Sequence, residues 1–235
     1  FASFVKGLNS GAVSGVIFYN CNPVYDHAHG ADIATGLGKA KFTLSTSDRN
    51  DETTALVKYV APDNHFLESW NDFEPVTGYF SLSQPAIKNI FDTRQAQQSF
   101  LTWSGDTTSY YDYVRANWEA NVFSKANTIE YFNFDAFWDK CLHDGVFEAP
   151  AEAEAAEYSV DAAAVAGAIA KTYSASNSGL ELVLYVNNSV AEGTQANNPW
   201  LQEMPDPITK ATWDNYLTVS PKQAAEWGIE LGDMS

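Results

Sequence analysis

Histidine and carboxylate side chains are the residues of this sequence whose spacing first suggests chemistry. His27 and His29 form an HxH pair beside Asp26, in a turn that is expected to follow the first strand. Two imidazoles and a carboxylate could hold a metal ion, although polar residues of an exposed turn give the same pattern. His65 and Glu68 form an HxxE pair, which is a weaker indication of the same kind. We therefore predict no metal ligand in either pair.

Cysteine chemistry is limited to Cys21 and Cys141, which are far apart and belong to no CxxC pair. Iron–sulfur clusters generally need four thiolates, so these two residues cannot hold a cluster alone. A disulfide between them stays open, but free and buried thiols are the reading we prefer. Neither GxGxxG nor GxxxxGK[ST] occurs, and no Ser-His-Asp or Cys-His arrangement can be assigned. The sequence therefore predicts no catalytic residue.

The charge of the chain excludes whole classes of partner. Against 13 Lys and Arg residues stand 30 Asp and Glu residues, for a net charge of −17. Such a surface repels nucleic-acid backbones and anionic lipids, because both bind through cationic side chains. The acidity either serves solubility or forms a face that docks a basic partner. No apolar run is long enough to span a bilayer, and both ends read as internal to a longer protein.

Helix and strand patterns alternate through the first part of the chain. The apolar run at 13–19 is typical of a buried parallel strand, and Asn9-Ser10-Gly11 ends the helix before it. The remaining expected elements are a helix at 31–39, a strand at 41–46, a short helix opened by 51–54 and a strand at 57–60. This alternation predicts an α/β fold with a doubly wound, mostly parallel sheet and flanking helices.

Beyond this sheet the pattern becomes helical and then irregular. Many aromatic residues recur at helical spacing in helices expected at 94–102, 110–122 and 134–142; they could line a quinone or cofactor, but a packed core is the preferred reading. There follow an acidic linker at 148–157, a small-residue helix at 161–171, a strand at 180–186, a short strand at 217–219, and a helix from Pro221 that is capped by Ser220 and closed by Gly228. We place the domain boundaries at 1–147, 148–178 and 179–235.

Ligands of a doubly wound sheet bind outside the carboxyl ends of its strands. The turn at 20–29 and the segment at 45–52 are expected at such ends, so a pocket is plausible there. The topology indicates where a ligand could bind, but it does not indicate a function for that pocket.

Several motifs then follow one another in an order that is typical of one family. They are Asn22-Pro23-Val24-Tyr25-Asp26, Asp51-Glu52-Thr53-Thr54-Ala55, the HxLESW form at 65–70, the QPxI and DTRQ forms at 84–87 and 92–95, and NPWLQEMPDPITK at 198–210. This succession resembles the third domain of the molybdopterin oxidoreductase (DMSO reductase) superfamily. Within it, the sequence looks closest to the molybdopterin-like iron–sulfur subunit of alternative complex III, a bacterial quinol-oxidising assembly. The closing segment from Ser220 resembles the start of the family's fourth, β-barrel domain, whereas residues 105–175 carry little of the likeness.

The resemblance implies that this stretch of the chain has no catalytic role. Active members usually have a glycine two residues before the Asn-Pro pair, which lets the backbone approach the phosphate-bearing tail of the cofactor. Here that position is Asn20, so we expect no pterin cofactor at the relic pocket positions, which are Asn20, Asn22, Pro23, Asp26, Asp51 and Glu52. Iron–sulfur clusters would then lie elsewhere in the same subunit, and haem c in partner subunits.

The first hypothesis is thus a non-catalytic scaffold portion of alternative complex III, at the periplasmic face of the bacterial inner membrane. Its expected partners are cytochrome c and integral membrane quinol-binding subunits, with no nucleic acid and no membrane span of its own. The alternative is part of an active polysulfide or thiosulfate reductase, whose dinucleotide pocket would be lined by Asn20–Asp26, Asp51 and Glu52. A free-standing α/β binding module is a third possibility.

Overall fold

A computed structural model describes residues 1–126, 130–150, 158–172 and 179–229. The chain divides into two compact units, Phe1–Ser174 and Ala175–Ser235. Each unit is considered by itself below.

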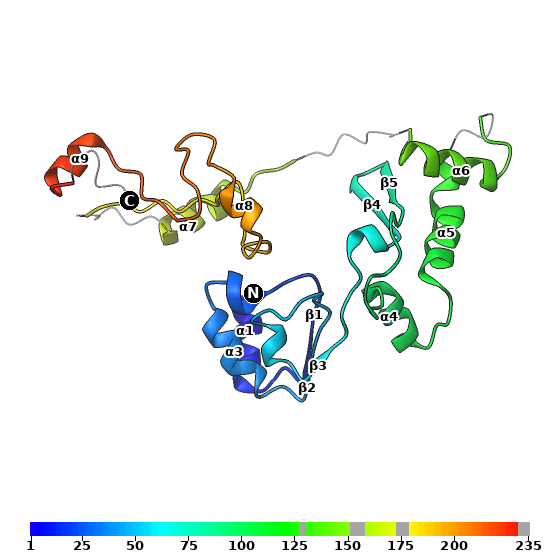
Figure 1. Cartoon of the computed structure of the whole chain (residues 1–235), viewed down its shortest axis with the longest axis horizontal. Coiled ribbons are helices and arrows are strands. Elements are labelled where there is room, and N and C mark those ends of the chain that lie inside the picture. Colours follow the sequence, from blue (N-terminus) through cyan, green and yellow to red (C-terminus); the bar gives the residue numbers. More distant parts are fainter. Residues whose placement is uncertain (127–129, 151–157, 173–178, 230–235) are drawn as a thin grey trace. The chain divides into compact units, whose positions relative to one another are not determined.

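The first unit begins with a parallel sheet of three strands in the order β1 (Gly15–Phe18), β2 (Phe42–Ser45) and β3 (Tyr59–Val60). Helices α1 (Ala2–Ser10) and α3 (Gly30–Leu37) lie against each other beside this sheet (Figure 1). The expected helix, strand, helix, strand order of this region is therefore confirmed, with boundaries shifted by a few residues.

One face of the sheet carries the first hydrophobic core. Alternate residues of β1, Val16 and Phe18, are buried against Leu8, Ile33 and Leu37 of the two helices. The helices can approach closely because of Gly36: a Cβ there would lie only 2.7 Å from the Leu8 Cγ. The close packing of α1 on α3 therefore depends on the absence of a side chain at Gly36.

The other face of this sheet departs from a doubly wound arrangement. Ile17, Phe42 and Tyr59 are exposed there, and the rings of Phe42 and Tyr59 stack on each other. Leu44, which pairs with both Ile17 and Tyr59, is buried, but in β1 only alternate residues are buried, so β1 is not buried on both faces as its apolar run suggested. The fold is mixed α/β, with a second sheet that is antiparallel.

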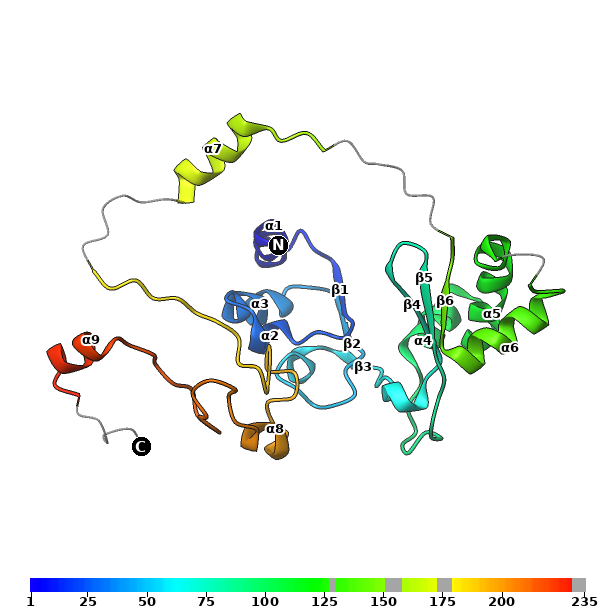
Figure 2. The ribbon, with the colours of Figure 1, turned by 90° about the horizontal axis from the view of Figure 1, so that it is seen from above.

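That second sheet was not expected from the sequence. It consists of β4 (Asn71–Val76), β5 (Tyr79–Ser83) and β6 (Val146–Glu148), all antiparallel. A turn at Gly78, with φ of 82°, joins the first two strands. The two residues Thr77-Gly78 between alternating runs are a hairpin signal that sequence reading overlooked. Figure 2 shows β4, β5 and β6 side by side, close to α5 and α6.

Helices cover one face of this sheet and enclose the aromatic core. They are α5 (Tyr110–Asn121), the short 3₁₀ turn η3 (Phe123–Lys125) and α6 (Phe134–Asp144), and α4 (Ala96–Ser104) packs on α5. Trp118, Phe137 and Trp138 are buried together with Phe80 of the sheet, and the indole N–H of Trp118 donates to Asp72 Oδ2 at 2.9 Å. The core interpretation of the aromatic residues is confirmed for these side chains.

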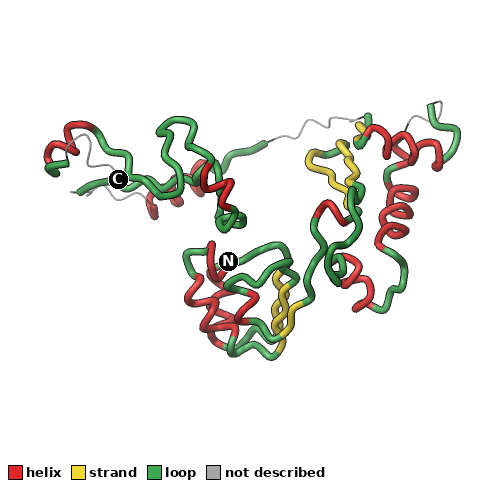
Figure 3. The backbone as a smooth tube through the Cα atoms, in the orientation of Figure 1, coloured by secondary structure: helices red, strands yellow, loops and turns green. Residues whose placement is uncertain are grey.

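The rest of the described chain is largely loop. The expected small-residue helix is present as α7 (Ala162–Thr172), while the acidic linker at 151–157 lies outside the described residues. The second unit holds α8 (Pro199–Glu203) and α9 (Pro221–Glu226) between long loops (Figure 3). Ser220 Oγ accepts from the Gln223 N–H at 3.2 Å, which confirms the expected cap.

Two strand predictions in the second unit are wrong. Residues 180–186 form no strand with any of the described residues, and their large apolar side chains are exposed. Residues 217–219 form no strand either, and the described part of the chain contains no closed barrel. No helix in the described ranges has the length and apolar character needed to cross a bilayer.

Candidate functional site

The carboxyl ends of the parallel strands form one connected edge, where a ligand of this sheet would bind. The N–H of Thr46, just after β2, donates to the Phe18 carbonyl of β1 at 3.0 Å. The N–H of Asp63, after β3, donates in turn to the Thr46 carbonyl at 3.0 Å. The three loops are therefore held to one another directly beyond the strand ends, as the sequence predicted for the first two.

Asn22 ties the turn after β1 to the segment after β2. Its Oδ1 accepts from the backbone N–H of Thr53 at 3.1 Å and from the Thr53 hydroxyl at 2.7 Å. Its Nδ2 donates to Glu52 Oε2 at 2.8 Å. Thr53 is fully buried, and its Oγ1 also accepts from the Val24 N–H at 3.2 Å. The structure thus brings together Asn22 and Glu52, which are 30 residues apart in the sequence.

The backbone donors of the same turn are already engaged. Helix α2 (Pro23–Asp26) follows Asn22, and its first residue, Pro23, is buried and has no N–H. The Val24 N–H donates to Thr53, and the N–H groups of Tyr25 and Asp26 donate to the Asn22 carbonyl at 3.0 and 3.1 Å. The first three N–H groups of this helix are therefore engaged within the protein, whereas phosphate-binding turns leave such donors free for the anion.

Asn20 occupies the tight bend before this helix. Its φ of 50° lies in the left-handed region, which glycine adopts freely and asparagine tolerates better than most residues. The bend that a glycine would make is therefore kept, but with a side chain attached. Whether the Asn20 side chain blocks the approach of a cofactor stays a prediction.

The electrostatics of the edge are acidic. Asp26 and Asp51 both act on the thiol of Cys21, whose pKa is raised by burial, with these two carboxylates adding to the effect and a hydrogen bond with the Tyr19 backbone opposing it. Asp51 Oδ1 also accepts from the Thr54 N–H at 2.7 Å, at the start of the 3₁₀ turn η1 (Thr54–Leu56).

One arginine lies among these acids, but it is engaged by a neighbouring carboxylate. Arg49 Nε donates to Asp48 Oδ1 at 2.9 Å. This hydrogen bond lowers the pKa of Asp48 and raises the pKa of Arg49. The positive charge at this edge is therefore largely compensated by Asp48.

The two cysteines lie in different environments. Both are free thiols, Cys21 exposed at the turn and Cys141 buried in α6, so the prediction of buried thiols holds for Cys141 alone. Burial raises the pKa of Cys141 to about 12, which leaves it protonated near neutral pH. Metal clusters and nucleophilic catalysis both use the thiolate, so neither thiol is prepared for either task.

The two histidine pairs take part in ring contacts and in a helix cap. The rings of His27 and His29 stack at 5.6 Å, and His27 also lies 4.2 Å from the ring of Phe1. His65 and Glu68 form a reciprocal cap on the 3₁₀ turn η2 (Phe66–Glu68), which explains their spacing. Within the described ranges, no three His, Cys, Asp or Glu residues come together as a possible metal site.

Sequence reasoning missed Thr53 and Asp63 as organising residues of the edge. The Oδ1 of Asp63 accepts from the N–H groups of Asn64 and Ala96, both at 2.8 Å, and thereby joins the end of β3 to the start of α4. Burial raises the pKa of this carboxyl. Its position directly after a strand and Pro62 was an available signal, because polar residues at strand ends line this edge.

These features together decide how well the edge fits a phosphate-bearing pterin cofactor. Binding would need free N–H donors or cations, whereas the amides of Val24, Tyr25 and Asp26 are engaged, Asn20 carries a side chain, and Asp26 and Asp51 add negative charge. The residues present therefore do not fit the group. What the edge shows is a set of hydrogen bonds that join its loops to one another.

Comparison with known proteins gives little further guidance. No family model matches the chain, and no curated protein matches it. Among solved structures, the chain is similar to acetylene hydratase from Pelobacter acetylenicus, with a TM-score of 0.43 and 11% sequence identity. The likeness covers 63% of this chain and 20% of that chain, so this sequence spans about a fifth of the other protein's length. At this level of similarity the match carries no functional assignment.

Proposed function

We propose that this chain is part of a non-catalytic scaffold region in the iron–sulfur subunit of a quinol-oxidising respiratory complex of the alternative complex III type. The order of sequence motifs from Asn22 to Lys210 is the basis for naming this family. Iron–sulfur clusters in the rest of the subunit and haem c in partner subunits would carry the electrons. The location would be the periplasmic face of the bacterial inner membrane, next to membrane-embedded quinol-binding subunits.

One observation carries the non-catalytic part of this proposal. The turn at Asn22 uses its own amides and side chain to bind Thr53 and Glu52, so a cofactor phosphate would have to break these bonds before forming others. It would also enter a region where Asp26 and Asp51 already act on Cys21. Both effects oppose binding of an anion, because unsatisfied buried donors and like charges are costly.

Metal analysis of the intact subunit tests the proposal against its rival. A scaffold region predicts less than stoichiometric molybdenum and tungsten, together with iron from clusters held elsewhere. One molybdenum or tungsten atom per subunit would overturn the scaffold role and support an active polysulfide or thiosulfate reductase.

Mutation of Asn20 provides a second, independent test of the proposal. Asn20→Gly restores the glycine of active members and relieves the positive φ of 50°. We expect quinol oxidation by the assembled complex to stay within about twofold of the parent, since no substrate or cofactor uses this turn. Ala191→Gly is the matched control, because Ala191 has a φ of 46° in the other unit. A large loss of turnover in Asn20→Gly alone, with assembly intact, would contradict the proposal.

A further inference from the structure

The first unit contains two hydrophobic clusters that share no residue. One cluster includes Phe18 of the parallel sheet, and the other includes Trp118 of α5. We call residues 1–63 the sheet body and the described residues of 64–150 the helical body. Two bodies with separate cores are expected to move relative to each other unless a large hydrophobic interface joins them.

The backbone passes from the sheet body to the helical body between Asp63 and Asn64. The Asp63 N–H donates to the Thr46 carbonyl at 3.0 Å, which fixes the chain to the sheet body up to this point. Directly afterwards, Asn64 Oδ1 accepts from the Thr93 hydroxyl at 2.7 Å, a bond within the helical body. Asp63 Oδ1 accepts from the Ala96 N–H at 2.8 Å, so the start of α4 lies next to this crossing. The crossing and this bond together make a pivot.

A second contact between the bodies is made by Tyr19, the residue that follows β1. Its hydroxyl accepts from Gln97 Nε2 of α4 at 2.7 Å. Its ring meets the ring of Phe100 edge-on, with centroids 5.9 Å apart. Because β2 lies between β1 and β3, this contact and the pivot are at the ends of different strands. We call the contact of Tyr19 with Gln97 and Phe100 the latch.

The chemistry of the latch allows it to open. Tyr19 is 45% exposed, so water can replace Gln97 as the partner of its hydroxyl with a small change in free energy. The edge-on ring pair adds a modest attraction. Gln97 is itself positioned by Asn71, whose Oδ1 accepts from Gln97 Nε2 at 3.4 Å. A closed state that is held by contacts of this kind can exchange with an open state, whereas a shared hydrophobic core would prevent it.

Helix α4 begins beside the carboxyl ends of the parallel strands. Ala96 contacts Asp63, which follows β3, and Gln97 contacts Tyr19, which follows β1. This is the edge at which ligands of a parallel sheet bind. The position of α4 therefore determines how far the edge is open to a ligand.

We propose that the helical body is a hinged lid, which turns about the pivot at Asp63 and Asn64 and is held closed over the strand-end edge by the latch at Tyr19. Residues at the ends of elements absorb the backbone change in such hinges, and the crossing after β3 is a place of this kind. The lid concerns access to the edge and not the metal or cofactor content of the subunit. It therefore stands or fails separately from the scaffold role.

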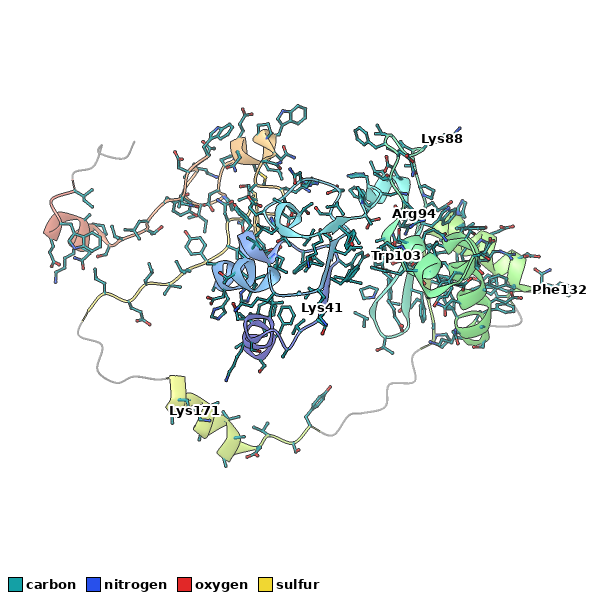
Figure 4. All side chains as sticks on the ribbon, turned by 90° about the horizontal axis from the view of Figure 1, so that it is seen from below. Lys41, Lys88, Arg94, Trp103, Phe132 and Lys171 are labelled. Carbon is teal, nitrogen blue, oxygen red and sulfur yellow. The ribbon has the colours of Figure 1, made fainter. Side chains whose placement is uncertain are left out.

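Distances between two spin labels on the full-length protein, measured by double electron–electron resonance, test the proposal. Cys21→Ser removes the exposed thiol from the parent, whereas Cys141 is 2% exposed and stays unlabelled. Lys41→Cys carries one label at an exposed position of the sheet body (Figure 4). Glu119→Cys carries the other label at an exposed position of α5 in the helical body.

We expect one main distance in this parent, from the closed lid, and a second distance from the open lid. In Tyr19→Phe the population with the second distance should rise about two- to tenfold, because one hydrogen bond of the latch is lost. Tyr19→Ala also loses the ring contact with Phe100, so the population with the second distance should rise further.

Two controls separate opening of the lid from loss of structure. Tyr25→Ala changes a tyrosine of the sheet body that is 52% exposed, and it should leave the populations as in the parent. A second label pair, Glu119→Cys with Asp139→Cys, lies within the helical body and should keep its distance in every variant. The proposal is overturned by unchanged populations in Tyr19→Ala, by an equal rise in Tyr25→Ala, or by a changed distance within the helical body.

Discussion

Removing the side chain of Asn22 should loosen the ligand edge of the parallel sheet without affecting the aromatic core. Asn22→Ala deletes the acceptor for the Thr53 N–H and hydroxyl, and the donor to Glu52. Thr53 is fully buried, so its N–H would lose its partner where water cannot replace it. An unsatisfied buried donor costs about 1–3 kcal/mol, and the exposed Glu52 bond adds little. We therefore expect a loss of about 2 kcal/mol in local stability.

Hydrogen exchange measured by mass spectrometry suits this prediction, because all 7 tryptophans lie outside residues 1–62 and would report poorly on this sheet. Amides of β1 and β2 should exchange up to about 30-fold faster in Asn22→Ala, as the lost free energy implies. Amides of α5 and α6 should be unchanged, because their hydrophobic cluster is separate from the one at the parallel sheet.

A matched variant separates this effect from general loss of an amide side chain. Asn121→Ala removes the 2.8 Å bond from Asn121 Nδ2 to Asn117 Oδ1, which is exposed at the end of α5. Its cost should be below about 0.5 kcal/mol, as for most surface substitutions. Unchanged exchange of β1 and β2 in Asn22→Ala would refute the view that Asn22 closes this edge. Equal acceleration throughout the first unit would refute the independence of the two cores.

Two further predictions concern packing and charge in the same unit. Gly36→Ala places a methyl group 2.7 Å from Leu8 Cγ. We therefore expect the melting temperature of this variant to fall, because the free energy of unfolding should decrease by about 1–3 kcal/mol. The control Gly38→Ala should change the melting temperature little, since the nearest atom to the added methyl group is 3.7 Å away. The raised pKa of Asp63 means that folding disfavours its charged form. Asp63→Asn keeps the Oδ1 acceptor, so thermal unfolding should show little difference below about pH 4 and a more stable variant near about pH 7. A less stable variant near neutral pH would contradict the sign of this shift.

Local patterns in the sequence were sufficient for most helices and for the parallel strands. The Asn9-Ser10-Gly11 stop is present as a left-handed Gly11 after α1, and Ser220 with Pro221 begins α9 as expected. These features depend on neighbouring residues, because caps and helix ends are satisfied within one turn. The order of the motifs from Asn22 onward, and the acidic composition, are likewise properties of the sequence itself.

Other features were decided only by tertiary contacts. The apolar run at 180–186 forms no strand, because a strand needs a partner whose position sequence does not reveal. The bonds from Asn22 to Glu52 and from Glu68 to Ile90 join segments that lie 30 and 22 residues apart. Such long-range bonds determine that the turn at Asn22 is tied to the segment after β2 and that the loops at 65–68 and 86–94 are held to each other. The physical reason is that residue types specify which bonds can form, whereas the packing of distant segments determines which of them do.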